Sequence, residues 1–252
     1  MKTIVLAAGY ATRLYPLTES FPKPLLEIGN STILGRMLDD IDTIPEIDGH
    51  IIVTNAKFAG IFEAWAEKRS CHSERSEESK PVKILSDGTY TNETRLGAVR
   101  DLILAIETYN LDEDLLVVAA DNILDFSFHG FVEAFHEKGT SMIMCHNEPE
   151  IWRLQRTGVI AVDENMRVLQ MQEKPAEPVS HWAVPPFYIY RKEDLPLIRT
   201  AIENGCGADA PGNLAHYLVD HTPIHAWPMP GGRFDIGSLD TYEEAKKKYA
   251  CE

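Results

Sequence analysis

The residues whose types most clearly indicate a chemical role lie in a loop near the start of the chain. An apolar run typical of a buried strand ends at Ala8, and Gly9 then allows a tight backbone turn. The small Ala11 and the polar Thr12 leave backbone N–H groups that can face an anion. Arg13 follows with a planar cation whose geometry suits phosphate. This composition indicates either a phosphate-binding loop or a plain connection from a strand to a helix.

A second cation follows in the same stretch. Lys23 lies between Pro22 and Pro24, whose rings restrict the local backbone and so direct the ammonium group. The stretch contains neither of the two common glycine-rich nucleotide motifs, G-x-x-x-x-G-K-[ST] and G-x-G-x-x-G. A dinucleotide-dependent dehydrogenase is therefore excluded, while a phosphate-binding loop of another kind is not.

A candidate metal ligand comes later, directly after the fourth apolar run. Asp121 and Asn122 follow the run LLVVAA, at the kind of strand end where ligands bind in open α/β sheets. Aspartate is a hard oxygen ligand that suits Mg²⁺. An aspartate that closes a turn would explain the same residue, so both interpretations stay open at this point.

The overall composition limits the partners. The chain has 252 residues and a formal net charge of −15, which disfavours nucleic acids and anionic membranes. The same charge would repel a phosphate substrate, so we expect locally concentrated cations and a metal ion. The four cysteines are scattered, and no apolar stretch is long enough to span a membrane. These features predict a soluble cytoplasmic protein with unpaired cysteines.

The order of the elements predicts an α/β fold. In the first part of the chain, β-branched apolar runs alternate with amphipathic segments, as in parallel strands joined by helices. We expect strands at Thr3–Ala7, His50–Thr54, Val82–Leu85, Leu115–Ala119 and Ser141–Cys145, and helices at Thr32–Ile41, Lys57–Lys68, Leu96–Thr108 and Phe128–Lys138.

The second part of the chain has a mixed pattern. We expect a hairpin from Gly158–Val162 and Arg167–Gln172, strands at Val184–Tyr190 and Ile224–Trp227, and helices at Lys192–Glu203, Asn213–Val219 and Leu239–Tyr249. Together these elements predict one domain over residues 1–252, with a nucleotide-binding half to about residue 145 and an acceptor-binding half from residue 146. The segment at residues 70–80, SCHSERSEESK, is so polar that we expect a disordered insertion without a catalytic role.

The loop closely resembles the signature of the sugar nucleotidyltransferase family, L-A-A-G-x-G-T-R-L-x-P-L-T followed by P-K-P-L. The match covers Leu6 to Leu25, with Ala11 in place of the second glycine. The resemblance implies a three-layer, Rossmann-like α/β/α fold with a mixed sheet, of the GT-A-like type. It also implies catalytic roles for Arg13 and Lys23 on the triphosphate. Nucleotide contacts are implied for Leu6, Ala8, Gly9, Thr12, Arg13 and Gly97.

Three later motifs resemble the same family in the same order. The D-N pair resembles the family's G-D-N element, and FDIGS resembles W-x-D-[IVT]-G-T, which implies that Asp121 and Asp235 hold Mg²⁺. These carboxylates could share one ion only if the last strand returns beside the fourth. The sequence Gln172-Glu173-Lys174-Pro175 resembles E-E-K-P, which implies a catalytic Lys174. Acceptor contacts are implied for Asn122, Gly158, Glu173 and Lys174.

The implied activity joins UTP, dTTP or CTP to a sugar 1-phosphate and releases pyrophosphate. Thr157 and Pro186 depart from the family pattern on the acceptor side, so the sugar is not specified, and the oligomeric state is open between a monomer and a homo-oligomer. One alternative is a cytidylyltransferase for phosphocholine, for which Trp152, Trp182 and Trp227 could supply an aromatic cage. Another alternative is a non-catalytic nucleotide-binding regulatory protein.

Overall fold

The computed structural model describes residues 1–73 and 79–249, and these fold into two compact units. The first unit consists of Met1–Arg95, Ala119–Phe128 and Gly231–Glu252. The second unit consists of Leu96–Val118 and His129–Pro230. The predicted halves, divided near residue 145, differ from these units because the C-terminal residues pack with the N-terminal ones.

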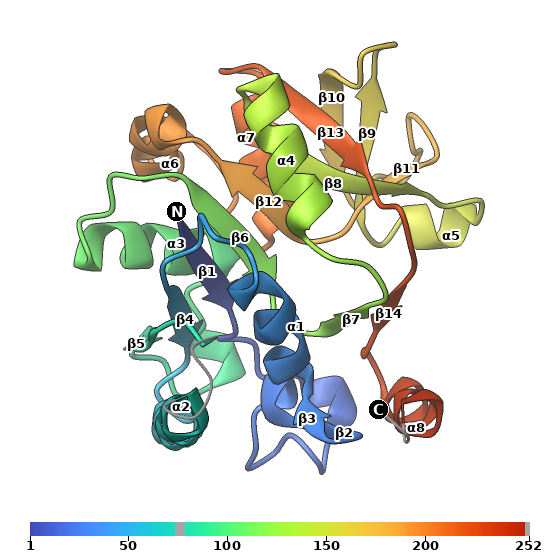
Figure 1. The fold of residues 1–252 in the computed structure, drawn as a ribbon. Helices are drawn as coiled ribbons and strands as arrows, with labels where there is room; N and C mark the ends of the chain where they lie inside the picture. The colour runs from blue at the N-terminus through green and yellow to red at the C-terminus, as the bar shows by residue number, and fades with distance from the viewer. Residues whose placement is uncertain (74–78, 250–252) are drawn as a thin grey trace. The chain divides into compact units, whose positions relative to one another are not determined.

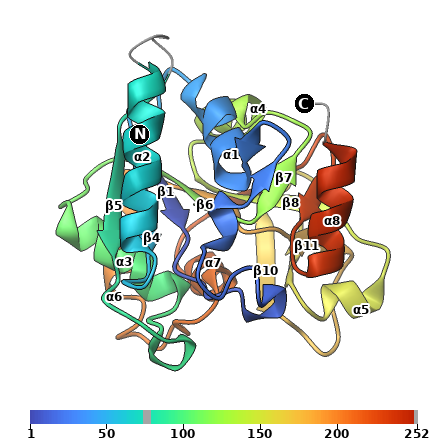
Figure 2. The same cartoon turned by 90° about the horizontal axis from the view of Figure 1, so that it is seen from below.

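The first unit is built on three parallel strands. β1 (Lys2–Leu6) pairs with β4 (His50–Thr54), which pairs with β5 (Val82–Ser86). Their β-branched side chains are suited to a pleated, buried surface, and all residues of β4 are buried. The connections run through α1 (Ile33–Asp42) and α2 (Ala59–Ser73), and α2 packs along β5 (Figure 2). These strands were predicted within one or two residues.

Shorter elements complete the first unit. They are the 3₁₀ turns η1 (Thr12–Leu14), η2 (Lys23–Leu25) and η3 (Asn92–Thr94), the strand pairs β2 (Glu27–Ile28) with β3 (Ser31–Thr32) and β7 (Asn122–Leu124) with β14 (Arg233–Asp235), and the final helix α8 (Leu239–Lys248). The last helix begins at Ser238, whose hydroxyl accepts from the Thr241 N–H. It anchors Tyr242 and Ala245 in a buried cluster with Leu14 and Ile28.

The second unit contains a mixed sheet with helices packed on it (Figure 1). Its strands are β6 (Leu115–Ala119), β8 (Ser141–Asn147), β9 (Gly158–Val162), β10 (Val168–Glu173), β11 (Trp182–Val184), β12 (Phe187–Tyr190) and β13 (Ile224–Pro228). Their order is β10-β9-β11-β8-β12-β6, and β13 pairs with β8 in parallel. The helices are α3 (Ala98–Thr108), α4 (His129–Lys138), α5 (Ile151–Leu154), α6 (Leu195–Thr200) and α7 (Pro211–Val219), preceded at α6 by the turn η4 (Lys192–Asp194).

The prediction of one strand over Val184–Tyr190 is wrong. Pro185 and Pro186 separate β11 from β12, because neither proline has an N–H to donate to a neighbouring strand. The two short strands then take different partners. β11 pairs with β8 and β9, whereas β12 pairs with β6 and β8.

Two other boundaries also differ from the prediction. The helix expected over Lys192–Glu203 ends at Thr200 and continues as turns. The expected disordered insertion at residues 70–80 is wrong for residues 70–73, which extend α2, and the Lys80 N–H donates to Asp42 Oδ1 at 3.2 Å. Residues 74–78 of this segment lie outside the described part of the chain.

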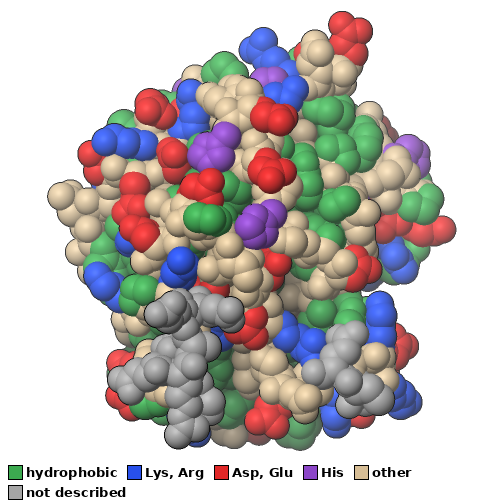
Figure 3. Space-filling view, in the orientation of Figure 1, with side chains coloured by type: hydrophobic (Ala, Val, Ile, Leu, Met, Phe, Trp, Pro, Cys, Tyr) green, Lys and Arg blue, Asp and Glu red, His purple; other side chains and the backbone are tan. Residues whose placement is uncertain are grey.

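The visible surface carries charges of both signs. Figure 3 shows acidic and basic side chains interspersed with apolar ones, without a continuous basic field. In residues 1–73 and 79–249, no helix is long and apolar enough to cross a bilayer.

A buried carboxylate ties together three parts of the second unit. Asp194 is 2% exposed and accepts from Ser141 Oγ on β8 at 2.5 Å and from Thr222 Oγ1, just before β13, at 3.0 Å. The Arg191 guanidinium donates to both of its oxygens, at 3.0 and 3.1 Å. Each oxygen is thus paired, as a buried charge requires.

We expect Asp194→Ala to lower the free energy of unfolding by about 3–5 kcal/mol, because the mutation leaves the Arg191 charge without its buried partner. Asp112→Ala is the matched control. Asp112 pairs with Lys192 at 2.8 Å but is 77% exposed, so its loss should cost at most about 1 kcal/mol. Urea unfolding measures both variants. Equal costs would show that burial of the Asp194 network contributes nothing.

Ala11 has a backbone conformation that favours glycine. Its φ of 46° and ψ of 42° lie in the left-handed region, where a Cβ atom is strained. The carbonyl oxygen of Ala11 is fixed by the Thr18 hydroxyl at 2.8 Å and the Leu14 N–H at 2.9 Å. These hydrogen bonds hold the loop in the strained conformation.

Ala11→Gly should therefore be neutral or should stabilise the protein by up to about 1 kcal/mol, since relief of strain offsets the greater freedom of the unfolded chain. The exposed Ala64 in α2 is the control. Ala64→Gly should destabilise by about 1 kcal/mol, as in an ordinary helix. Thermal unfolding compares the two, and similar losses would show that Ala11 is unstrained.

Candidate functional site

The loop after β1 is fixed by a hydrogen bond at its start and is exposed to solvent further along. β1 ends at Leu6, and the Ala8 carbonyl oxygen accepts from Asn55 Nδ2 at 3.0 Å, which fixes the start of the turn. Gly9, Thr12 and Arg13 are all exposed. The loop therefore presents backbone and a guanidinium to solvent, as a phosphate-binding loop must. Sequence analysis could not predict this role of Asn55, because an asparagine after a strand is compatible with many kinds of turn.

Lys23 and Asp121 form the centre of the site in the first unit. Lys23 is only 8% exposed, and its Nζ lies 3.0 Å from Asp121 Oδ2. The other carboxylate oxygen, Oδ1, accepts from Asn122 Nδ2 at 2.7 Å. A buried lysine is costly unless it is paired, so this ion pair fixes both side chains. The prediction that Lys23 is directed by its flanking prolines agrees with its place in η2.

Asp235 reaches the same centre through strand pairing. β14 runs antiparallel to β7 and places Asp235 opposite Asn122 (Figure 1). The Ile236 N–H donates to the Asp121 carbonyl oxygen at 3.1 Å. A shared metal ion required the last strand to return beside the fourth predicted strand. In the structure, β14 returns beside β7, which directly follows that fourth strand. Neither three-residue strand shows a periodicity that sequence analysis could detect.

The charges around Asp235 show that the two carboxylates interact. Although the side chain keeps contact with solvent, neighbouring atoms crowd it, and this partial burial raises its pKa above the usual value. The negative charge of Asp121 raises the pKa further, while Lys23, Arg233 and Arg13 act in the opposite direction. Two hard oxygen donors that repel each other fit a divalent cation.

This donor set fits Mg²⁺ better than a metal held entirely by protein. In residues 1–73 and 79–249, no group of three or more His, Cys, Asp or Glu side chains is arranged to hold an ion. Mg²⁺ is commonly bound by one or two carboxylates together with phosphate oxygens and water. Asp121 and Asp235 are the residues that would hold it.

The contacts of Asn122 differ from those expected of an acceptor-binding residue. It is 2% exposed, its Nδ2 donates to Asp121, and its Oδ1 accepts from Arg233 Nη1 at 2.8 Å. Both ends of the amide are thus engaged within the first unit. These contacts support a role in orienting Asp121 rather than in binding an acceptor.

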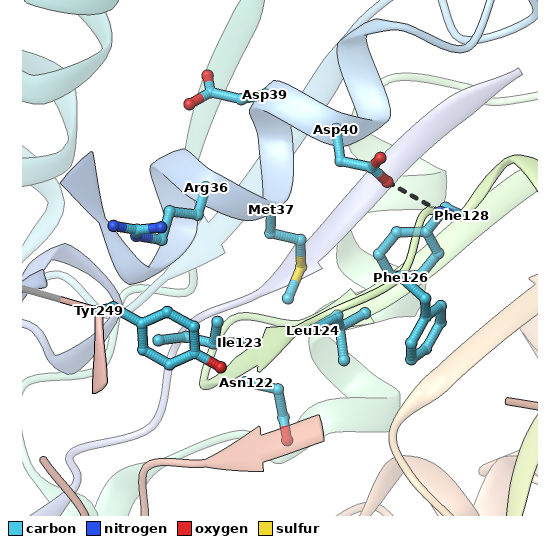
Figure 4. Close-up of a pocket in the computed structure, with 10 residues that line it drawn as sticks. All are labelled: Arg36, Met37, Asp39, Asp40, Asn122, Ile123, Leu124, Phe126, Phe128 and Tyr249. Atoms are coloured by element: carbon cyan, nitrogen blue, oxygen red, sulfur yellow. Dashed lines mark hydrogen bonds between the residues drawn. The ribbon is translucent and has the colours of Figure 1, made fainter. Parts of the chain in front are cut away.

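A cavity of about 310 Å³ lies behind β7 in the first unit (Figure 4). Met37 and Phe128 give it an apolar wall, and Asp40 is turned to the Phe128 N–H, with which it is hydrogen-bonded at 2.9 Å. Lys23, Asp121 and Asp235 do not line this cavity. Asn122 does line it, so the cavity adjoins the candidate metal site without including its charged residues.

Three of the four predicted acceptor residues, Gly158, Glu173 and Lys174, meet in the second unit, whereas Asn122 belongs to the first. Glu173 ends β10 and lies opposite Gly158 on β9. Lys174 follows with φ of 48°, its N–H donates to the Thr157 carbonyl oxygen at 3.0 Å, and its Nζ lies 3.7 Å from Glu173 Oε1. A cavity of about 690 Å³ adjoins them, lined by Gln172, Glu173, Pro175, Ala176, Glu177, Asn213 and His216. Sequence analysis missed Asn213 and His216, which become neighbours of Glu173 only through the packing of α7 on β10.

Burial raises the pKa of Glu173, and the nearby Lys174 charge counters part of this effect. The side chain is 17% exposed. A carboxylate this enclosed gains much from donors that a bound molecule supplies. Sugar hydroxyl groups are such donors.

Gly97 is explained by the fold of the second unit. Its φ is 93°, and a Cβ atom there would lie 2.5 Å from the Ala208 carbonyl oxygen. The N–H groups of Ala98 and Val99 donate to Asp209 and Ala208. Close packing of the start of α3 against residues 208–209 therefore requires glycine, whatever contact it makes with a nucleotide.

Two of the three tryptophans proposed for a choline cage, Trp152 and Trp227, make other contacts. Arg153 and Arg156 both lie over the Trp152 ring, each at 5.2 Å from its centroid. Trp227 packs against Phe131 at 5.5 Å between ring centroids. Guanidinium groups already occupy the ring that a quaternary ammonium would need. The structure thus gives the phosphocholine alternative no support at Trp152 or Trp227.

Comparison with known proteins gives one consistent family. A family model described as nucleotidyl transferase matches residues 2–252. UTP–glucose-1-phosphate uridylyltransferase AglF of Haloferax volcanii is 25% identical over 257 residues, which cover 98% of this chain and 96% of that protein. The mannose-1-phosphate guanylyltransferase catalytic subunit beta of Dictyostelium discoideum is 30% identical over 211 residues, which cover 81% of this chain and 54% of that protein. The chain thus spans the first relative almost fully but about half the length of the second.

A solved structure shows the same fold. The crystal structure of a UDP-glucose pyrophosphorylase complexed with UDP-glucose has a TM-score of 0.81 and 20% identity, with 98% of this chain and 97% of that chain covered. This likeness confirms the predicted α/β fold with a mixed sheet. Because the family match extends over nearly all residues and includes those that build the Lys23–Asp121–Asp235 centre, we conclude that the chain belongs to the nucleotidyl transferase family.

Proposed function

We propose that this protein condenses a nucleoside triphosphate with a sugar 1-phosphate to give a nucleotide sugar and pyrophosphate. The observation that carries the proposal is the strand pairing that puts Asp235 opposite Asn122, beside Asp121 and the buried Lys23. Family membership and the sugar-1-phosphate nucleotidyltransferases among the relatives support it. The relatives use different bases and sugars, so the proposal covers the reaction class. The cytoplasmic location expected from the sequence remains part of the proposal.

In the proposed reaction, a phosphate oxygen of the acceptor attacks the α-phosphorus of the triphosphate. The new P–O bond forms as the bond to the β-phosphate oxygen breaks, and pyrophosphate leaves with that electron pair. The nucleophile is already an anion, so the protein has to align two negatively charged reactants and reduce their repulsion. Arg13 and Lys23 would bind the triphosphate, and Lys174 would bind the phosphate of the acceptor.

Asp121 and Asp235 would hold Mg²⁺, which when bound supplies positive charge to the reacting phosphates. The chain prepares for this by orienting one ligand through Asn122, which Arg233 fixes in turn. Lys23 balances part of the carboxylate charge from a buried place. Support for Mg²⁺ thus comes from the types of ligand and from their mutual repulsion.

The direct test is to incubate the protein with Mg²⁺, one triphosphate at a time and a panel of sugar 1-phosphates plus phosphocholine, and to measure pyrophosphate release. We expect turnover with at least one sugar 1-phosphate and none with phosphocholine. Turnover with phosphocholine alone would replace the proposed acceptor, and inactivity with all pairs would contradict the proposed function.

Asp121→Asn and Lys23→Gln should each lower kcat by about 100-fold or more, because each removes a charge that acts on the reacting phosphates. Steady-state kinetics with the preferred pair measures the loss. Each substitution also removes one partner of the Lys23–Asp121 ion pair, so the melting temperature should fall as well, and kcat is measured at a temperature at which both variants are folded.

The exposed residues Asp240 and Lys247, on α8 of the same unit, provide the controls. Asp240→Asn and Lys247→Ala should leave kcat within about twofold, since surface charges away from the site contribute little. Near-normal turnover of Asp121→Asn would show that Asp121 takes no part in the reaction.

The raised pKa of Glu173 predicts a pH effect on stability. The folded protein holds the Glu173 proton more tightly than the unfolded chain does, so the stability from this group is present at low pH. It is lost as pH rises from the ordinary value of 4.5 through the raised pKa. Urea unfolding of Glu173→Gln should show a smaller decline over this window than the wild type, and identical pH profiles would contradict the assignment.

A further inference from the structure

The first turn of α7 contains a glycine where a side chain would collide with Glu173. Pro211 opens the helix and Gly212 follows. A Cβ atom built on Gly212 would lie 1.9 Å from Glu173 Oε2 and 3.0 Å from its Cδ. Real Cβ atoms do not approach so closely, so any other residue at 212 would move the Glu173 carboxylate or the helix.

A second glycine lies on the other side of the same carboxylate. Gly158 is opposite Glu173 in the β9–β10 ladder. Its added Cβ atom would lie 3.4 Å from Glu173 Oε2 and 2.9 Å from Met171 Cε. Glu173 Oε2 thus lies close to two backbones that carry no side chain, while Oε1 faces the Lys174 ammonium group.

The position of α7 on β10 is also fixed one turn further along. His216 Nδ1 is hydrogen-bonded to the Met171 carbonyl oxygen. Because a carbonyl oxygen can only accept, Nδ1 carries the proton in this bond. α7 therefore touches β10 at Gly212 and at His216, which lie on the same face of the helix. The helix cannot move away from Glu173 without breaking the second contact.

Glycine at position 212 makes α7 intrinsically less stable than alanine would, and nothing within the helix itself calls for glycine. Gly212 is buried within α7, and its φ is not in the left-handed region. Alanine would favour the helix more than glycine does. No left-handed φ therefore requires glycine here, and the added Cβ atom would meet Glu173 most closely, with Met171 Cε next at 3.2 Å.

We propose that Gly212 is a positioning residue for acceptor recognition, which acts by allowing α7 to close on the Glu173 carboxylate at the edge of the cavity lined by Asn213 and His216. This inference rests on the proposed function, in which Glu173 binds the hydroxyl groups of a sugar 1-phosphate. An acceptor rich in hydroxyl groups is the matching ligand.

The test is a double-mutant cycle on Gly212→Ala and Glu173→Ala. Gly212→Ala should raise the KM for the sugar 1-phosphate about tenfold or more, because it displaces a charged hydrogen-bond acceptor. The KM for the triphosphate should change less than about twofold, because the proposed triphosphate contacts Arg13 and Lys23 are not altered. In the Glu173→Ala background, Gly212→Ala should have no further effect on either KM.

Thermal unfolding provides a readout that does not need activity. Gly212→Ala should lower the melting temperature of the wild type. In the Glu173→Ala background it should raise the melting temperature, because the collision is gone and alanine favours the helix. Additive effects in both melting temperature and KM would show that Gly212 does not act through Glu173 and would overturn the inference.

Gly60 is the matched control, since it follows the first residue of α2 just as Gly212 follows the first residue of α7. A Cβ atom on Gly60 meets nothing within 4 Å, so Gly60→Ala should leave both KM values unchanged. If the wild type releases no pyrophosphate with any pair, the proposed function fails. The unfolding cycle then still decides whether Gly212 positions Glu173, and calorimetry with glucose 1-phosphate decides whether that position serves binding.

Discussion

The candidate metal site depends on the return of the chain end to β7. Two three-residue strands are too short to be stable alone, so other contacts have to hold them together. One is the Arg233–Asn122 hydrogen bond, and another is the apolar anchoring of α8 through Tyr242 and Ala245. The position of Asp235, a candidate metal ligand, is thereby coupled to the packing of a helix that contributes no candidate ligand.

The same pairing also brings two negatively charged side chains together at the candidate metal site. Asp121 and Asp235 repel each other, and partial burial adds to the cost of keeping Asp235 ionised. Lys23 offsets part of this cost through its contact with Asp121. In a chain with a net charge of −15, Lys23 and Arg13 bring positive charge to this place in the first unit. A site with this balance favours a divalent cation over another anion.

Sequence analysis predicted the long elements and the types of the site residues, but not their geometry. β4, β6 and β9 have the predicted bounds because their apolar runs are continuous. β7 and β14 were missed because three residues carry no period. Pro185 and Pro186 were interpreted only as a change near the acceptor, whereas they also divide a strand. Asn122 was assigned from its motif, and its two hydrogen bonds inside the first unit depend on contacts that no motif specifies.

Among the described residues, four non-glycine residues have a left-handed φ, and two of them lie at or near candidate phosphate-binding cations, whereas Asn110 and Met166 lie elsewhere. Ala11, two residues before Arg13, and Lys174 itself both have left-handed φ values, 46° and 48°, although neither is glycine. In both cases a hydrogen bond holds the residue, from the Thr18 hydroxyl in one and to the Thr157 carbonyl in the other. Gly212 is the converse, since a helical place that would favour alanine keeps glycine. Local conformational preference is thus opposed at three places beside the candidate phosphate-binding and acceptor-binding residues, as expected where side-chain placement outweighs stability.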